Sequence, residues 1–486
     1  MPFWDELREK FASDDHVQSV LRTIATIDAQ PLYDAYRGTG SKPFDPLRLF
    51  AIALVEILNG STSPAAWHRD ASTRDQCKFV GHGATPSRTA WYDFRDRCSK
   101  FIDQVHCSLV TNAIDQGLIE PRECCLDGTF SAAAASRHKI FNLKQISRRC
   151  GRLKQAIHQL DNPHQVASRK VLLSVPRWIA KTASGRQQQL QQYTAAKLRM
   201  LENIEKNRLK PARYQKDEAS MVISPADVDA VIGRDKFHVL RPLYNTQMMA
   251  DCGSDLIVAF GVFAKQNDSG TLVPMIHKSQ QILGGMLDTV HADSSYCSIL
   301  DLQDCAGLKI NLYAPVQDNT AASKKLANGE KQIPSQEFAF DEATGQMTCP
   351  GGHAMRFVKE VQVARADGRT LGELRYEQSR ELCSSCPLAA RCVGGPSQRR
   401  TVARQSQQKI LDQQKAKMES VSGKRSARLR GQVIERRFAD GKLHRNQGVQ
   451  NGRGLSRVYA EVGLLAVAQN TLTLYNREKP RPDAPI

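Results

Sequence analysis

The sequence predicts a mixed α/β protein in which a strand-containing core follows a helical region and is interrupted by two insertions. Three observations indicate this class. Amphipathic helical patterns fill about the first quarter of the chain, short apolar runs alternate with helical patterns in the middle, and a basic helical segment and a group of cysteines interrupt the rest. With 486 residues, the chain is long enough for two to four domains.

Residues 1–115 are expected to form a helical N-terminal domain. Asp45, followed by proline, is a typical helix start before the apolar run LRLFAIALVEIL. In the stretch TPSRTAWYDFRDRCSKFI, Ser87 is a candidate N-cap, and the apolar residues recur at helical spacing, which leaves Arg88 and Arg95 for another face. The pattern fits a helix-turn-helix that binds DNA, and it fits an ordinary amphipathic core helix equally well.

Strand patterns occupy residues 116–317. CCLDGTF is a short apolar run that ends in Asp127 and a turn, and MMADCGSDLIVAFGVFAK predicts two antiparallel strands. MLDTVHADSSY predicts a further buried strand that ends in Asp293, and a helix and the strand KINLYAP follow. Residues 399–478 return to helical patterns, including RLRGQVIERRFADGKLH and an apolar helix, and residues 479–486 form a tail.

The charge of the chain is concentrated in one insertion. The net charge is +18, which favours a polyanionic partner, with nucleic acid first and a membrane surface second. Residues 136–216 hold 19 Lys and Arg against three acidic residues, and their apolar residues recur at helical spacing. This segment predicts a basic helical insertion, either a solvated arm or one that lies along a phosphate backbone. The absence of a long apolar run and of an export signal predicts a soluble, intracellular protein.

A second insertion, residues 318–398, carries clustered cysteines. Thirteen cysteines, an odd number, in a chain without an export signal predict reduced thiols rather than a disulfide framework. The candidate zinc ligands are Cys349, Cys383, Cys386 and Cys392. Two residues between Cys383 and Cys386 suit one tetrahedral zinc, and His353 could replace one of the outer cysteines. Reduced thiols that pack a small loop domain, or a redox pair, are the alternatives.

Three carboxylates are candidates for catalysis. Asp127 and Asp293 end predicted strands, where open α/β sheets place ligands, and Glu435 lies in an arginine-rich helix. Three hard oxygen donors that converge would hold a pair of divalent cations suited to phosphodiester chemistry. The nearby His291 is interpreted as an ordinary strand histidine, and Cys125 as an inert core thiol.

The order of these motifs resembles a known family. It is carried by FDPLRLFAIALVEILNGSTSPAAWHRDA, CLDGTF, RPLYNTQMMADCGSDLIVAFGVFAKQNDSG, VHADSSY and IERRFADGKLH. In this order the chain resembles the DDE transposases of bacterial insertion sequences, in the branch with a ribonuclease-H-like catalytic core and a helical N-terminal domain. The fold implied is a ribonuclease-H-like mixed sheet with the two insertions described above. By the same resemblance, Tyr244, Asn245 and Gln247 support the core.

The resemblance implies a metal-dependent recombinase. Asp127, Asp293 and Glu435 would bind two Mg²⁺ (or Mn²⁺) ions, water would nick the transposon end, and the freed 3′ hydroxyl would attack target DNA without a covalent protein–DNA intermediate. Seven positions separate Glu435 from Lys442, which places both on one helix face about 10 Å apart, so that Lys442 can reach a neighbouring phosphate. The further residues expected to contact DNA are Arg430, Arg436, Arg437, Arg88 and Arg95.

The expected partners are the terminal repeats of the transposon and target DNA, both double-stranded, with a homodimer on paired ends and a cytoplasmic, nucleoid-associated location. There is one departure from the family, whose motif often has a tyrosine and an arginine at set positions upstream of the glutamate. Here position 431, four before Glu435, is glycine, the nearest arginine is Arg430, and no tyrosine precedes Glu435 in that helix. Two alternatives to a transposase are a non-catalytic DNA-binding protein derived from one and an RNA-processing nuclease. A covalent recombinase would need a nucleophile such as Tyr459, which lies in an apolar helix.

Overall fold

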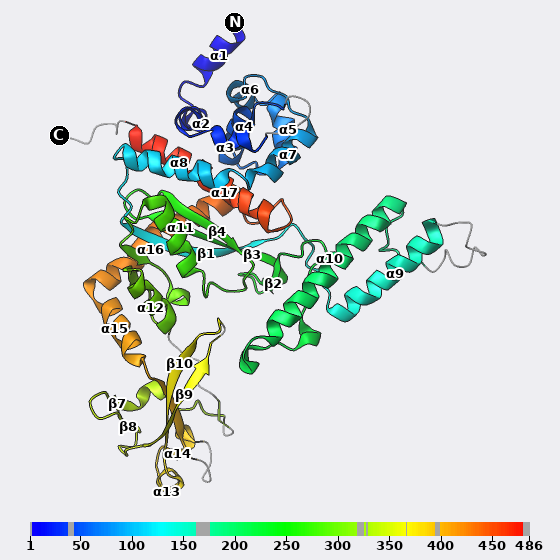
Figure 1. Cartoon of the computed structure of the whole chain (residues 1–486). Coiled ribbons are helices and arrows are strands. Elements are labelled where there is room, and N and C mark those ends of the chain that lie inside the picture. The colour runs from blue at the N-terminus through cyan, green and yellow to red at the C-terminus, as the bar shows by residue number, and fades with distance from the viewer. Residues whose placement is uncertain are drawn as a thin grey trace, which may run out of the picture.

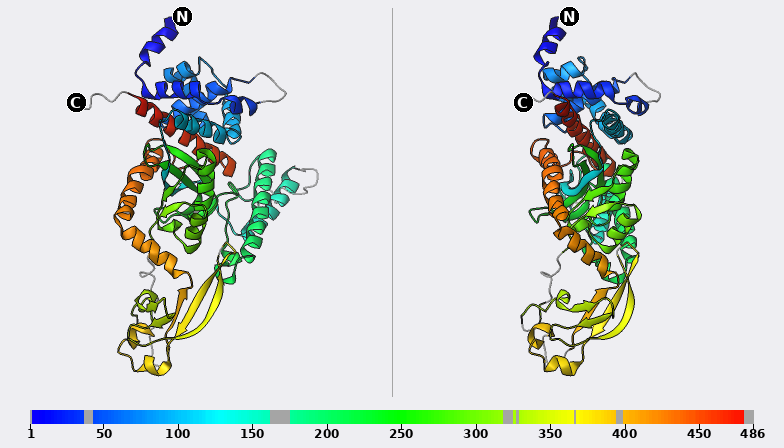
Figure 2. Two further views of the ribbon diagram at one scale, coloured as in Figure 1. Left: turned by 60° about the vertical axis from the view of Figure 1, so that its left-hand side comes forward. Right: turned by 90° about the vertical axis from the view of Figure 1, so that its left-hand side faces the viewer.

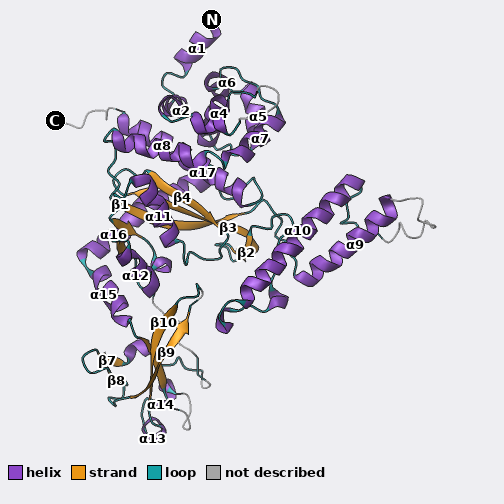
Figure 3. Ribbon diagram, viewed as in Figure 1, coloured by secondary structure: helices purple, strands orange, loops and turns teal. Residues whose placement is uncertain are grey.

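The computed structural model describes residues 2–36, 43–161, 175–317, 325–326, 329–365, 367–393 and 399–479. Over these residues the chain has a central sheet between helices, a long helical hairpin that projects from it, and a small β-rich unit at the end distant from the N-terminal helices (Figure 1, Figure 2). Helices and strands are mixed throughout the central part (Figure 3). The predicted α/β class is confirmed.

The central sheet has six strands, and β1 lies in its middle. The strands are β1 (Glu123–Ala132), β2 (Val231–Arg234), β3 (Leu240–Asp251), β4 (Ile257–Phe263), β5 (Thr289–His291) and β6 (Asn311–Tyr313). Strand β1 pairs antiparallel with β3 on one side and parallel with β5 on the other, and β6 continues parallel to β5. Strands β2 and β4 both pair with β3, antiparallel to it. The sheet therefore has an antiparallel half and a parallel half that meet at β1.

Helices cover both faces of this sheet. They are α11 (Leu272–Leu283), α12 (Ile299–Gly307), α15 (Gln408–Glu419), α16 (Val421–Leu443) and α17 (Leu455–Glu478). Helix α16 packs on β1, β3 and β5, on the face that carries Asp127. On the other face α11 packs against β3, where the Ser279 hydroxyl lies 3.0 Å from the Met249 sulfur. Among the described residues, no helix combines the length and the hydropathy that crossing a bilayer requires.

The N-terminal region is helical, as predicted. Its helices are α1 (Pro2–Lys10), α2 (Asp15–Thr26), α3 (Gln30–Asp34), α4 (Pro46–Leu58), α5 (Pro64–Thr73), α6 (Asp75–Val80), α7 (Arg88–Cys98) and α8 (Ile102–Asp115). The expected caps are present: Asp45 accepts a hydrogen bond from the Leu47 amide at the start of α4, and Ser87 accepts one from Ala90 at the start of α7.

These helices do not have a core of their own. One continuous hydrophobic cluster includes the N-terminal helices, the sheet and α17. Three consecutive residues of α17 bond to three different parts: Gln469 to the Arg437 carbonyl of α16, Asn470 to the Ile257 amide of β4, and Thr471 to Thr23 of α2. The predicted separate domain 1–115 is therefore packed onto the core through a helix from the C-terminal region.

The basic insertion forms a helical hairpin of α9 (Leu143–Asp161) and α10 (Ala183–Arg208), which projects from the sheet (Figure 1). It has its own small hydrophobic cluster, in which Ile146, Leu153 and Met200 are buried. Residues 162–174 of this insertion and 480–486 of the predicted tail lie outside the described residues.

The cysteine-bearing insertion forms a separate small β unit. Its elements are β7 (Ala339–Asp341), β8 (Gln346–Thr348), β9 (Arg356–Ala364), β10 (Thr370–Glu377), α13 (Arg380–Ser384), α14 (Ala389–Cys392) and β11 (Thr401–Gln405). Because β11 pairs antiparallel with β10, this unit continues past the boundary predicted at residue 398. The order β11-β10-β9 and the hairpin β7-β8 enclose a third hydrophobic cluster.

Candidate active site

Asp127 lies on β1, the strand at which the two halves of the sheet meet. Its side chain is 16 % exposed and pairs with Arg430 of α16 at 3.0 Å. Burial raises the pKa of Asp127 to about 6, and the charges of Asp293 and Asp268 add to this rise, whereas Arg430 and the Gly128 amide oppose it. Several carboxylates therefore lie close together at this point of the sheet.

Asp293 follows β5 and lies beside Asp127 because of strand pairing. Strand β5 runs parallel to β1, so the residues that follow β5 lie at the edge of the sheet toward which β1 runs. The Asp293 carboxylate accepts hydrogen bonds from the amide and the hydroxyl of Ser295, at 2.7 and 2.5 Å. These bonds fix the carboxylate at the start of the short helical turn Ser294–Tyr296.

A third aspartate, Asp268, belongs to the same group and was missed by the sequence reasoning. The Ser295 hydroxyl lies 3.3 Å from its Oδ2, and its Oδ1 accepts hydrogen bonds of 2.8 Å from the side-chain amides of Asn245 and Gln247. Burial raises the pKa of Tyr296, and the charges of Asp268, Asp127 and Asp293 all add to the rise. The one signal in the sequence is the pair of amide side chains, Asn245 and Gln247, on a buried strand, because buried amides require polar partners.

Glu435 approaches these acids from α16. Arg430, five residues earlier, lies 3.0 Å from Asp127 and 3.5 Å from the Glu435 carboxylate, so one guanidinium bridges both. The Glu435 side chain is 55 % exposed, in contrast to the largely buried Asp127. Arg430, expected to contact DNA, lies here as the counter-charge of two carboxylates.

Lys442 lies on the same side of α16 as Glu435 and reaches β1. Its ammonium donates to the hydroxyl of Thr129, which is two residues beyond Asp127 and therefore on the same face of the strand. Burial lowers the pKa of Lys442, Lys236 adds to this, and Asp127 opposes it. The spacing predicted from the sequence thus brings the lysine close to the acids.

The other arginines expected to contact DNA have different surroundings. Arg436 is exposed on α16, and Arg88 is exposed at the start of α7. Arg437 instead points toward α17, where it donates to Thr473 at 2.9 Å, and burial lowers its pKa. Arg95 is 7 % exposed and pairs with Asp96. A DNA contact does not fit Arg437 or Arg95, because neither guanidinium is free at the surface.

The four cysteines of the small β unit converge, together with His353. The side chains of Cys349, Cys383, Cys386, Cys392 and His353 line one small cavity. Burial raises the pKa of Cys392, and the other three cysteines add to the rise. In the part of the chain that the structure describes, no three of these ligand atoms lie within 4.8 Å of one another. The thiols are therefore neighbours but are not drawn together as closely as ligands on one ion.

The acid group has the donor set of a magnesium or manganese site. Asp127, Asp293, Asp268 and Glu435 offer only carboxylate oxygens, the hard ligands that Mg²⁺ and Mn²⁺ prefer. Burial is the main cause of the raised pKa of Asp127, and the negative charges of Asp293 and Asp268 add to it. These residues fit divalent cations by their chemistry.

Comparison with protein families gives one match. Residues 348–475 match the family model described as "Transposase DDE domain". This span begins in the small β unit and includes α16 with Glu435 and most of α17, whereas β1 and β5 precede it. A search of curated proteins found no match, and a search of solved structures found none. The match of residues 348–475 confirms the resemblance of this chain to the DDE-type transposases.

Proposed function

We propose that this protein is a DNA transposase that cleaves transposon ends and joins the freed 3′ hydroxyl to target DNA by two-metal-ion phosphoryl transfer, without a covalent protein–DNA intermediate. The matched DDE domain gives the general class. The observation that supports the finer proposal is Arg430, which pairs with Asp127 at 3.0 Å and lies 3.5 Å from Glu435, while the charge of Asp293 acts on Asp127. No three of these acids, among the described residues, have ligand atoms within 4.8 Å of one another, so loading with metal requires them to move closer.

The sheet supports a ribonuclease-H-like catalytic core. Its strand order is β4-β3-β1-β5-β6, with β3 antiparallel to β1, and with β5 and β6 parallel to it. The first acid lies on the central strand, the second follows the adjacent parallel strand, and the third comes from a helix packed on the same face. Such a sheet gathers acids that are far apart in sequence at one edge.

In this proposal Asp127, Asp293 and Glu435 hold two Mg²⁺ or Mn²⁺ ions. When bound, such ions activate the attacking oxygen and stabilise the leaving oxygen at a phosphodiester. For Asp127 and Glu435 to hold an ion, Arg430, which now pairs with Asp127 and lies 3.5 Å from Glu435, would have to turn away from them. Ser295 and the amides of Asn245 and Gln247 keep Asp293 and Asp268 oriented.

Phosphate contacts would come from basic residues on several elements. Lys442 lies next to Thr129 on the acid-bearing face, so a phosphate at the acids is within its reach. Arg436 and Arg88 are exposed, as are Lys144, Arg148 and Arg152 along one face of α9. The projecting hairpin α9–α10 then extends the contact along the duplex, and a homodimer would hold two transposon ends.

End cleavage tests the catalytic proposal. The full chain is incubated with DNA that carries the inverted repeats flanking its gene, with Mg²⁺ or with EDTA. We expect nicking at the repeat end only with Mg²⁺, and a loss of at least 100-fold in Asp127→Ala, Asp293→Ala and Glu435→Ala. The control is Asp288→Ala, an acid before β5 whose side chain is 60 % exposed and which should keep full activity.

Other outcomes would favour the alternatives. DNA binding that is indifferent to Mg²⁺, with no cleavage of the repeats, indicates a non-catalytic DNA-binding protein. Cleavage of RNA or of a hybrid duplex in preference to DNA indicates an RNA-processing nuclease. If the three alanine variants keep wild-type activity, the metal-binding role of the acids is wrong. Sedimentation of the protein with paired ends tests the homodimer.

We propose a structural zinc in the small β unit, held by Cys349, Cys383, Cys386 and Cys392. The convergence of these thiols on one cavity supports the site, and closing around an ion requires a contraction of the ligands. Protein purified without chelator should contain zinc, and Cys383→Ala should lose about one equivalent. Zinc below about 0.2 equivalents in the wild type would contradict this site.

A further inference from the structure

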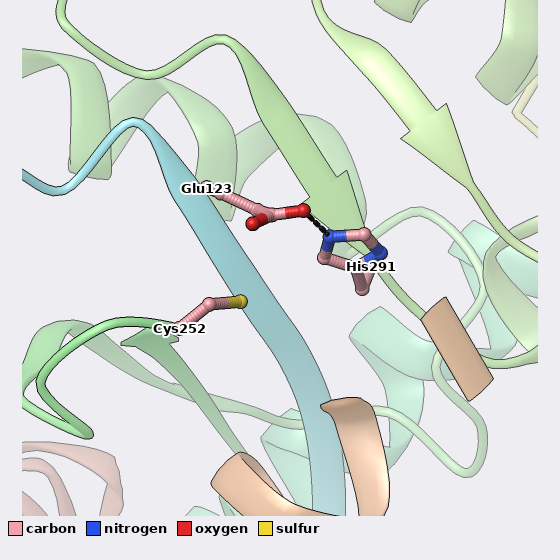
Figure 4. A group of neighbouring side chains, drawn as sticks. All are labelled: Glu123, Cys252 and His291. Carbon is pink, nitrogen blue, oxygen red and sulfur yellow. Dashed lines mark hydrogen bonds and ion pairs between the residues drawn. The ribbon is translucent and has the colours of Figure 1, made fainter. Parts of the chain in front are cut away.

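A second group of potential ligands lies at the other end of β1, remote from the acids. Glu123 is the first residue of β1, Cys252 follows β3, and His291 ends β5. One ligand atom from each of the three residues lies within 4.8 Å of the other two. Figure 4 shows the Glu123 carboxylate against the His291 ring, with the Cys252 sulfur directed toward the pair.

Strand pairing brings these three residues together. Strand β1 pairs antiparallel with β3, with Cys124 opposite Asp251, so Cys252 comes opposite Glu123. Strand β1 also pairs parallel with β5, with Cys125 opposite His291. The pairing of β1 with its two neighbouring strands therefore brings the three residues together, two of them in strands and Cys252 at the first position of the turn after β3.

A fourth ligand is within reach. The Cys125 sulfur lies 3.4 Å from the Cys252 sulfur. Cys125 is two residues after Glu123 and therefore points to the same face of β1. Cys125 is not among the residues whose ligand atoms all lie within 4.8 Å of one another. A small rotation of its side chain would be needed to bring the sulfur toward Glu123 and His291.

The distances are close to those around a tetrahedral ion. Zinc bonds of about 2.3 Å to sulfur and 2.0–2.1 Å to nitrogen or oxygen place neighbouring ligands about 3.3–3.8 Å apart. The His291 Nε2 atom lies 2.8 Å from the Glu123 carboxylate, and the two sulfurs are 3.4 Å apart. Small outward movements of these side chains would accommodate the ion.

Residues of α16 surround this group as an outer layer. The Ser426 hydroxyl lies 2.7 Å from His291 Nδ1, the ring nitrogen on the other side from Glu123. Arg425 pairs with both Glu123 oxygens, at 3.2 and 3.1 Å. Hydrogen bonds of this kind orient metal-binding histidines and carboxylates in proteins.

We propose that Glu123, Cys252 and His291 form a zinc site, with Cys125 as the fourth ligand. A thiolate and an imidazole select zinc, whereas the carboxylate-only group around Asp127 selects magnesium or manganese. Asp127 lies four residues further along β1, about 13 Å away, so the two sites are separate. This inference goes beyond the proposed function and stands whether or not the protein cleaves DNA.

The zinc would act as a positioning element. It would connect β1, β3 and β5 at one point, and through Arg425 and Ser426 it would fix the start of α16. Glu435 follows Ser426 on the same helix by nine positions, so the orientation of this helix determines where the Glu435 carboxylate lies.

Zinc counting in the full chain tests the site. The protein is expressed with added Zn²⁺, purified without chelator under reducing conditions, and its zinc is measured by mass spectrometry. Cys252→Ala and His291→Gln should each lose about one equivalent relative to the wild type. The matched control is Cys124→Ala, a buried thiol one position from Cys125, which should keep the wild-type content. An unchanged zinc content in Cys252→Ala, or a Cys125–Cys252 disulfide in reduced preparations, would overturn the proposal.

A second measurement leaves the proposed ligands unchanged, so it remains informative if the ligand variants do not fold. Zinc-edge X-ray absorption is recorded on Cys383→Ala, in which only the site at the start of β1 should remain loaded. A mixed shell of sulfur with nitrogen or oxygen supports the proposal, whereas a sulfur-only shell or the absence of zinc overturns it. Neither measurement depends on transposition activity, so a failure here is distinct from a failure of the proposed function.

Discussion

Replacement of Asp127 by asparagine should stabilise the metal-free protein while abolishing cleavage. The pKa of Asp127 rises from 3.8 to about 6, mainly by burial. At 1.36 kcal/mol per pKa unit, this rise means that ionised Asp127 destabilises the fold by about 3 kcal/mol at pH 7. Asparagine has the shape of the protonated acid without its charge, so Asp127→Asn should gain up to about 3 kcal/mol in the free energy of unfolding.

The stability difference between the wild type and Asp127→Asn depends on pH. A carboxyl whose folded pKa is raised holds its proton more tightly in the folded state, so the wild type loses stability as the pH rises from about 4 through 6. The advantage of Asp127→Asn should therefore shrink from about 3 kcal/mol at pH 7 to less than about 1 kcal/mol at pH 4.

Urea unfolding in EDTA, at several pH values, measures this difference. Glu435→Gln is the comparison, because its side chain is 55 % exposed and its replacement should change the stability little. Added Mg²⁺ should reverse the order by stabilising the wild type and not Asp127→Asn. If Asp127→Asn is no more stable than the wild type in EDTA at pH 7, the inference that the buried Asp127 carboxylate destabilises the metal-free protein is refuted.

Three further predictions concern Gly128 of β1, Lys442 of α16 and the basic face of α9. Gly128→Ala should abolish end cleavage with the fold retained by circular dichroism, because its methyl group would lie 2.0 Å from the Gln247 amide and 2.5 Å from Asp268; wild-type cleavage would contradict this. Lys442→Met should slow cleavage about 10- to 100-fold, the equivalent of one hydrogen bond to a charged group, with binding of end DNA nearly unchanged. The double variant Arg148→Gln, Arg152→Gln should lower the slope of log K against log salt by about 2, and an unchanged slope would remove α9 from the DNA interface.

The acids on the sheet could be located from the sequence, because each ends a short apolar run. A strand that enters a polar turn leaves its last side chains at the sheet edge, and Asp293 follows β5 in this way. The turn predicted after Asp127 is wrong, because Asp127 lies inside β1, which continues to Ala132 and stays paired with β3. Asp268 could not be found in this way. It lies in a polar turn after β4, and only the register of β3 brings Asn245 and Gln247 to it.

Contacts between segments that are distant in sequence explain why Arg95 is not exposed as predicted. The helical pattern of α7 put Arg95 on an outer face, but Arg457, at the start of α17, pairs with Asp96 and covers that face. For His291 and Cys125 the sequence indicates ordinary strand residues, because nothing near them in sequence indicates that Glu123 and Cys252 lie beside them in the fold. Patterns along the chain identify elements, whereas the partner that an element's face meets depends on segments that are hundreds of residues away.

The central position of α17 has a consequence for how the protein is made. This helix is synthesised after every element it joins, and its residues Gln469, Asn470 and Thr471 connect the helix α16, the sheet and the N-terminal helices. Until it has left the ribosome, apolar surface on all three remains open to water and to chaperones. Gene copies shortened before residue 455 would therefore yield polypeptides that proteases remove, so that damage at the 3′ end of the reading frame silences the whole protein.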